Sequence, residues 1–149
     1  MEKYILKTLN LARKAFEKDE VPVGAIIVKD DKIIAKAYNV RNSKKSALCH
    51  AEIIAINKAC KKLNDFRLNG CTMYVNLEPC AMCAGAILNA RIDKVVFGAY
   101  EKRSGCCGSK LNVLQHGSEI HKVEVVGGVL EKECAEIMKE FFSGKRKKK

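Results

Sequence analysis

The chain has 149 residues, of which 48% are hydrophobic and 30% charged, with two prolines, ten glycines and a net charge of +11. This length and composition predict one globular domain with a sizeable core and exclude a disordered, collagen-like or linker sequence. No stretch reaches the ~20 apolar residues of a membrane span and the N-terminus lacks the apolar core of a secretory signal, so we expect a cytoplasmic protein without a membrane partner.

The first half of the chain predicts a helix, a hairpin and a second helix. Apolar residues recur at helical spacing over 5–16, which indicates an amphipathic helix that ends before Pro22. Two apolar runs rich in β-forming residues, 23–28 and 33–38, are joined by a short polar turn and predict a hairpin. A polar loop then leads to a second amphipathic helix over about 50–63.

The second half alternates strands and helices. We expect strands at 71–76, 94–99 and 123–126, and helices at 80–90 and 131–142. Because helices lie between strands in this half, the strands should be parallel and helices should cover both faces of the sheet. The predicted fold class is α/β, a three-layer α/β/α sandwich around a mixed five-stranded sheet.

The sequence contains no internal repeat and no boundary between folded domains. We expect one domain over residues 1–144, followed by a basic tail over 145–149 whose simplest interpretation is a solvated end. The connection over 100–121 is long for a compact domain, and such loops usually serve a function or move.

The eight cysteines would suggest disulfides in a small secreted protein, but the size, the lysine content and the missing signal indicate a reducing compartment. Metal-binding or core roles are therefore expected. Cys60, Cys71 and Cys134 fall within apolar periodic segments and are expected to be small buried side chains. Cys106 and Cys107 are interpreted only as small buried or oxidisable side chains.

Two short clusters of residues carry the chemistry. His50 and Glu52 open one predicted helix, and Cys80 and Cys83 open another directly after Pro79. Cysteines three residues apart share a helical face, and the positive end of the helix dipole favours thiolates. Two thiolates and one imidazole suit zinc, and three protein ligands leave a position for water, which implies catalysis. We therefore predict one Zn²⁺ per chain, held by His50, Cys80 and Cys83.

Glu52 provides a group that can accept a proton from the activated water and deliver it to a leaving group. Residues two apart on a regular helix face different ways, so His50 and Glu52 can serve one site only at a helix start. Redox or purely structural use of the Cys-x-x-Cys pair is the alternative, and the upstream His-x-Glu pair argues against it. Cys49 is interpreted as a packing residue, because adjacent residues seldom converge on one metal.

The pairing of H-x-E with P-C-x-x-C is the signature of zinc nucleobase deaminases, including cytidine, deoxycytidylate and guanine deaminases. Longer blocks are more specific and make the chain resemble the bacterial tRNA-specific adenosine deaminase family over nearly its whole length. These blocks are EVPVGA at 20–25, LEPCAMCAGA at 77–86, VVFGA at 95–99 and GGVL at 127–130. The chain departs from the family pattern over 45–49 and at Asn76, which leaves the chemistry intact and affects contacts at the pocket rim.

The resemblance implies a cytidine-deaminase-like fold, a homodimer, and hydrolysis of the wobble adenosine to inosine in the anticodon stem-loop of an arginine tRNA, with release of ammonia. It implies the same zinc ligands and a proton shuttle at Glu52. Asn39 would hydrogen-bond the base, and the alternative is that it is an ordinary turn residue. Val23 would line the pocket, and the alternative is that it is a core strand residue. Ala51, Glu101 and Lys102 are also expected to contact the substrate, and a solvated charged loop is the alternative for the last two.

Three functions compete on the sequence. They are a tRNA-editing enzyme, a deaminase of a free base or nucleotide (guanine, cytidine or deoxycytidylate), and a non-catalytic zinc-stabilised RNA-binding module. Glu52 and the three-ligand set argue against the module. The 28 Lys and Arg against 17 Asp and Glu favour a polyanionic RNA over a small substrate, and five Phe, four Tyr and no Trp predict contacts to the RNA backbone more than base stacking.

Overall fold

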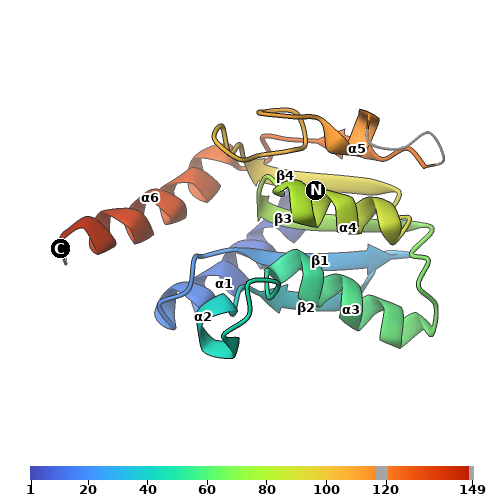
Figure 1. The fold of residues 1–149 in the computed structure, drawn as a ribbon, viewed down its shortest axis with the longest axis horizontal. Coiled ribbons are helices and arrows are strands. Elements are labelled where there is room, and N and C mark those ends of the chain that lie inside the picture. Colours follow the sequence, from blue (N-terminus) through green and yellow to red (C-terminus); the bar gives the residue numbers. More distant parts are fainter. Residues whose placement is uncertain (117–120, 148–149) are drawn as a thin grey trace.

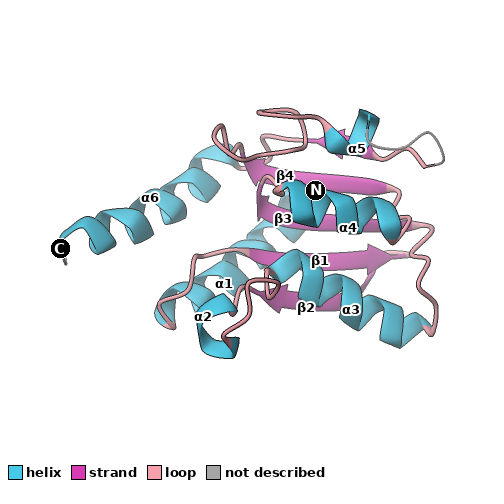
Figure 2. Cartoon of the chain, in the orientation of Figure 1, coloured by secondary structure: helices cyan, strands magenta, loops and turns pink. Residues whose placement is uncertain are grey.

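The computed structural model describes residues 1–116 and 121–147, and it consists of one five-stranded sheet with helices on both faces (Figures 1 and 2). The strands are β1 (Gly24–Lys29), β2 (Lys32–Tyr38), β3 (Cys71–Leu77), β4 (Lys94–Ala99) and β5 (Glu124–Val126), in the spatial order β2-β1-β3-β4-β5. The helices are α1 (Glu2–Glu17), α2 (Arg41–Lys44), α3 (Ala51–Leu63), α4 (Ala81–Asn89), α5 (Val113–His116) and α6 (Glu131–Lys147). No helix in these ranges is long and apolar enough to cross a membrane.

The predicted hairpin of β1 and β2 turns through two residues. Asp30 and Asp31 both have positive φ, 51° and 61°. This is the backbone conformation of the two central residues of a type I′ turn, whose twist matches that of antiparallel strands. Aspartate is among the few residues besides glycine that tolerate this conformation, which explains why the turn can be so short.

The rest of the sheet is mixed, as the alternation of strands and helices predicted. β1 pairs antiparallel with β2 on one edge and with β3 on the other. β3 and β4, and then β4 and β5, pair in parallel. The α4 helix connects β3 to β4, which is the crossover that a parallel pair requires. The predicted mixed five-stranded sheet is therefore confirmed.

Two apolar layers hold the helices against the sheet. On one face, side chains of α3 and α4, such as Ala55, pack against sheet residues such as Ile27. On the other face, Ile5 of α1 and Cys134 of α6 share a cluster with Ile26. Ile26 and Ile27 point to opposite faces because side chains alternate along a strand. The three-layer architecture is thus confirmed.

The α1 helix crosses β1 so closely that Gly24 has no room for a side chain. A Cβ atom at residue 24 would lie 2.4 Å from the Thr8 carbonyl oxygen and 2.6 Å from Leu11 Cβ. We expect Gly24→Ala to lower the free energy of unfolding by about 1–3 kcal/mol, the usual cost of overpacking. Urea denaturation would measure it, with Gly144→Ala as the control, since a Cβ there meets no atom within 4 Å. Equal stability of the two variants would show that α1 can shift without cost.

Three helical segments differ from the sequence predictions. α2 lies within the expected polar loop and α5 within the long connection, and four residues are too few to produce a recognisable periodicity. α6 continues to Lys147 instead of ending at Phe142. Its added turn contacts the body, because Lys145 Nζ lies 2.7 Å from the Asp19 carboxylate. Residues 117–120 of the predicted connection and 148–149 of the predicted tail lie outside the described residues.

Candidate active site

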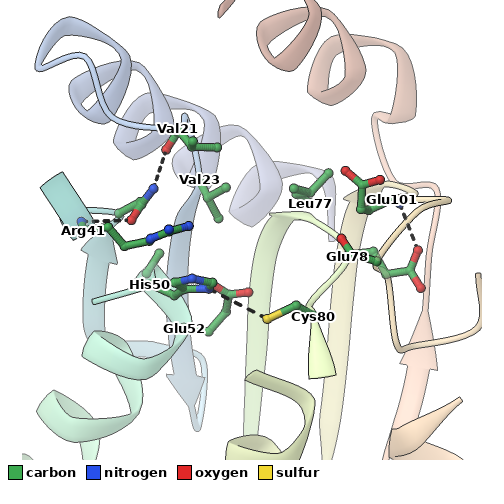
Figure 3. Close-up of a pocket in the computed structure, with 12 residues that line it drawn as sticks. Val21, Val23, Arg41, His50, Glu52, Leu77, Glu78, Cys80 and Glu101 are labelled. Carbon is green, nitrogen blue, oxygen red and sulfur yellow. Dashed lines mark hydrogen bonds between the residues drawn. The ribbon is translucent and has the colours of Figure 1, made fainter. Parts of the chain in front are cut away.

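The predicted metal ligands meet at the end of the sheet where α3 and α4 begin, and Figure 3 shows two of them, His50 and Cys80. His50 is the N-cap of α3 and Cys80 is the N-cap of α4. Both have an extended backbone, with ψ of 149° and 179°, so each residue directs the chain into its helix. Glu52 is the second residue of α3. The pair His50 and Glu52 therefore occupies a helix start, which is the condition for the two residues to share a site.

The three ligand atoms are close enough to share one metal ion. His50 Nδ1 lies 3.8 Å from Cys80 Sγ and 3.5 Å from Cys83 Sγ, and the three atoms all lie within 4.8 Å of one another. With zinc–sulfur bonds of about 2.3 Å and zinc–nitrogen bonds of about 2.0–2.1 Å, a tetrahedral site places nitrogen and sulfur about 3.5 Å apart. Within residues 1–116 and 121–147, this is the one group of His, Cys, Asp and Glu side chains found in such an arrangement. The cluster therefore has the donor types and approximate spacing of a metal site.

The charge state of the cluster also fits a cation. Hydrogen bonds from Cys83 and His50 lower the pKa of Cys80 to about 3, so this sulfur is a thiolate. The hydrogen bond to Cys80, together with burial, raises the pKa of Cys83, which keeps its proton in the absence of a cation. The same Cys80 contact raises the pKa of His50. A divalent cation would favour two thiolates and release the remaining proton.

Glu52 lies at the wall between the cluster and a cavity. Its side chain is only 4% exposed, and Figure 3 shows it beside His50 and near Cys80. Burial raises the pKa of the Glu52 carboxyl group above its ordinary value. A carboxyl group in such surroundings can hold a proton before passing it on, which is the behaviour of a general acid–base residue.

The cavity next to the cluster has a volume of about 130 Å³. Its lining includes five residues predicted for the site besides the ligands His50 and Cys80, namely Val23, Asn39, Ala51, Glu52 and Glu101. Lys102, also predicted, is exposed in the adjoining turn and does not line this cavity. The remaining lining residues were not predicted from the sequence, and they are Val21, Arg41, Leu77, Glu78 and Ser104. Val21, Leu77 and Glu78 fall within the family blocks at 20–25 and 77–86, which was a signal for them, whereas Arg41 and Ser104 lie outside every motif and are identified only by the folded chain.

Asn39 serves the turn between β2 and α2. It is 5% exposed, its Nδ2 donates to the Val21 carbonyl at 3.2 Å, and its Oδ1 accepts the Arg41 N–H at 3.2 Å. The structure therefore shows Asn39 as a turn residue, which is one of its two interpretations. An amide side chain has two N–H donors and two acceptor lone pairs, so these two bonds leave capacity for a base. Val23 likewise combines both interpretations, since it is buried in the core and lines the cavity.

The cysteines outside the cluster are core or half-buried side chains. Cys71, Cys106, Cys107 and Cys134 are buried, whereas Cys60, which was predicted to be buried, is only half-buried. None of the eight cysteines, all of which lie within the described residues, forms a disulfide. Cys49 is also half-buried and does not belong to the metal-binding group. The prediction that Cys49 is not a fourth ligand agrees with this placement.

The chain matches the MafB19-like deaminase family model over residues 1–146. It is 48% identical over 148 residues to the tRNA-specific adenosine deaminase of Bacillus subtilis (strain 168), covering 99% of this chain and 92% of the relative. A solved structure from studies of A-to-I editing by tRNA:A34 deaminases at the wobble position of transfer RNA superposes with a TM-score of 0.86 at 39% identity, covering 91% of this chain and 99% of that one. The guanine deaminase of Nitrosomonas europaea has a TM-score of 0.81 at 24% identity, covering 94% and 83%, and shares the fold. These similarities, which extend over nearly the whole chain, show that it belongs to the tRNA-specific adenosine deaminase family.

Proposed function

We propose that this protein hydrolyses the wobble adenosine in the anticodon loop of an arginine tRNA to inosine and releases ammonia, with one Zn²⁺ per chain. The observation that carries the proposal is the buried Glu52 carboxyl group beside the His50, Cys80 and Cys83 cluster, at the wall of one cavity. The names of the relatives support tRNA as the substrate class. From the same family relationship we propose that the protein is a homodimer in the cytoplasm.

Each residue would have a distinct part in the reaction. Zinc held by the cluster supplies a Lewis acid that activates water at neutral pH. Glu52 would accept a proton at its carboxylate and return it to the departing amine. Asn39 would orient the adenine ring through its remaining amide hydrogen-bonding groups, and Val23 would pack against the ring.

The RNA would be held mainly through its phosphates. Arg41 lines the cavity, and Lys102 and Arg103 are exposed in the turn beside Glu101. A base in a single-stranded loop is already largely unstacked, so its entry into the cavity costs less than extrusion from a duplex. An anticodon stem-loop is therefore expected to suffice as the substrate.

A direct comparison of substrates tests this function. The purified protein would be incubated with an arginine tRNA that carries an unmodified wobble adenosine, with its stem-loop, and with free adenosine, guanine, cytidine and deoxycytidylate. We expect inosine and ammonia from both RNAs. Turnover of a free compound with none on the tRNA would instead establish the deaminase of a free base or nucleotide, an alternative that the fold shared with a guanine deaminase keeps open.

The basic C-terminus should contribute to affinity and not to chemistry. Deleting residues 146–149 removes four positive charges and leaves Lys145 in place to contact Asp19. RNA binding should weaken, and the slope of log affinity against log salt should become shallower by about 0.7–0.9 for each phosphate that the shortened chain no longer neutralises. Fluorescence anisotropy with a labelled stem-loop over a series of salt concentrations measures the slope. An unchanged slope would leave these residues a role in solubility only.

A further inference from the structure

Two segments outside the sheet border the active-site cavity from opposite sides (Figure 3). We call them the α2 rim, residues 41–46, which carries Arg41, and the 101–109 rim, which carries Glu101 and Ser104. No residue of α2 is buried, so apolar packing does not hold the first rim in place. Both rims nevertheless have a defined position, and in both the main-chain N–H groups point to a carboxylate from another part of the chain.

The 101–109 rim closes around Glu78, which follows β3 and is only 3% exposed. The Glu78 carboxylate accepts the N–H groups of Glu101, Cys107 and Ser109, each at 3.0 Å, and the Ser109 hydroxyl. The rim approaches so closely that a Cβ atom at Gly105 would lie 2.4 Å from the carboxyl carbon. All four donors are neutral, and three of them are main-chain groups of the rim.

The α2 rim is held in the same way by Glu20, which is 1% exposed. Its carboxylate accepts the Asn42 N–H at 3.0 Å, the Ser43 N–H at 2.7 Å and the Ser43 hydroxyl at 2.6 Å. Burial acts to raise the pKa of Glu20, but these hydrogen bonds and the charge of Arg41 outweigh it and lower the pKa below its ordinary value. The lowered pKa favours the ionised form of Glu20, in which both oxygens act only as acceptors.

We infer that Glu20 and Glu78 are positioning residues for the reaction: each holds one rim of the cavity in the place where that rim meets the RNA. Within the part of the chain that the structure describes, neither carboxylate hydrogen-bonds to the metal-binding cluster, and each acts through the segment that it binds. In a glutamine variant one carboxylate oxygen becomes an NH₂ donor, so some N–H groups of the rim lose their acceptor and face a donor instead, which favours an open rim. The inference rests on the proposed function, since the rims matter most for a substrate larger than the cavity.

The test replaces each carboxylate with its neutral isostere, in Glu20→Gln and Glu78→Gln. The matched control is Glu124→Gln, which also removes one carboxylate charge but from a side chain that is 64% exposed on β5. Amide hydrogen exchange of the zinc-loaded, RNA-free enzyme, read by mass spectrometry, should become faster over 41–46 in Glu20→Gln and over 101–109 in Glu78→Gln. The control should leave both segments unchanged, and all three variants should keep their zinc.

Kinetics with the stem-loop provide a second readout. A displaced rim weakens binding without changing the reacting groups, so KM should rise about tenfold while kcat changes much less. The exchange measurement needs no substrate, so the two hypotheses can fail separately. If exchange becomes faster at the expected rim but the enzyme does not act on tRNA, the proposed function is wrong and the positioning role of the carboxylates stands. Should a glutamine variant fail to fold, Ser43→Ala and Ser109→Ala remove the side-chain donor to each carboxylate and keep the main-chain donors, so exchange should increase at the same rim but by less.

Two results would overturn the inference. One is unchanged exchange at a rim in a folded variant that has lost its carboxylate, because the rim would then keep its position without it. The other is a fall in kcat that follows a loss of zinc with KM unchanged, because the carboxylate would then act on the metal-binding cluster.

Discussion

Replacing Glu52 with alanine should remove most turnover while leaving the metal and the fold in place. Glu52 lies beside the cluster but is not one of its three ligands. General acid–base groups typically contribute ~10²–10⁴-fold to the rate, so kcat should fall by at least this factor. Single-turnover deamination of the stem-loop, with zinc content determined on the same preparation, measures both quantities.

The isosteric variant Glu52→Gln separates proton transfer from packing. Glutamine fills the same space as the buried carboxyl group, so it should fold like the original chain and be as inactive as the alanine variant. If either variant deaminates the stem-loop at the original rate with full zinc, Glu52 is not the proton-transfer group. A loss of zinc in both would show instead that Glu52 takes part in holding the metal.

The second large effect is expected for Cys83→Ser, which should lose both zinc and stability. Cys83 is fully buried on α4, and its sulfur lies 3.5 Å from His50 Nδ1 at the start of α3. A metal at this point joins the two helix starts, so its binding free energy adds to the stability of the fold. A serine hydroxyl does not ionise as a thiol does and replaces the ligand poorly. Metal analysis should find the zinc content fall from about one per chain to near zero, and Tm should fall with it.

Cys134→Ser is the matched control for this change. Cys134 is also a fully buried thiol, but it belongs to α6 on the opposite face of the sheet. Burying a hydroxyl there should lower Tm through packing alone, and the zinc content should stay at its original value. If Cys83→Ser behaved in the same way as this control, Cys83 would not be a ligand.

That His50, Cys80 and Cys83 lie together was predictable from the sequence. Zinc requires particular ligand types, and both motifs, with their places at two helix starts, can be recognised in the sequence. The hairpin and the parallel strands were predictable for a similar reason, since period and turn residues are local properties. Arg41 and Ser104 were not predicted, because they lie on the two rims, whose other residues hydrogen-bond to Glu20 and Glu78 from distant parts of the chain.

The difference between local and long-range contacts also bears on two other predictions, the role of Asn39 and the end of α6. Asn39 was assigned to the base on the family pattern, and its bonds to Val21 and Arg41 show that the turn also needs it. The end of α6 was placed too early because the contact between Lys145 and Asp19 joins residues at opposite ends of the chain. The Asn39–Arg41 bond is a local turn contact that the sequence offered as an alternative, whereas the Lys145–Asp19 contact is tertiary and no local pattern encodes it.

The way in which the two rims are held has a consequence for how this enzyme can change. Every residue except proline has a main-chain N–H, so the grip of Glu20 and Glu78 does not depend on the side chains that the rims present to a substrate. Arg41, Lys102 and Ser104 can vary while the rims stay in place, whereas Gly105 cannot accept a Cβ atom. Evolution, or a library randomised at those three positions, can therefore alter the contacts that the rims make with the substrate backbone without disturbing the chemical centre.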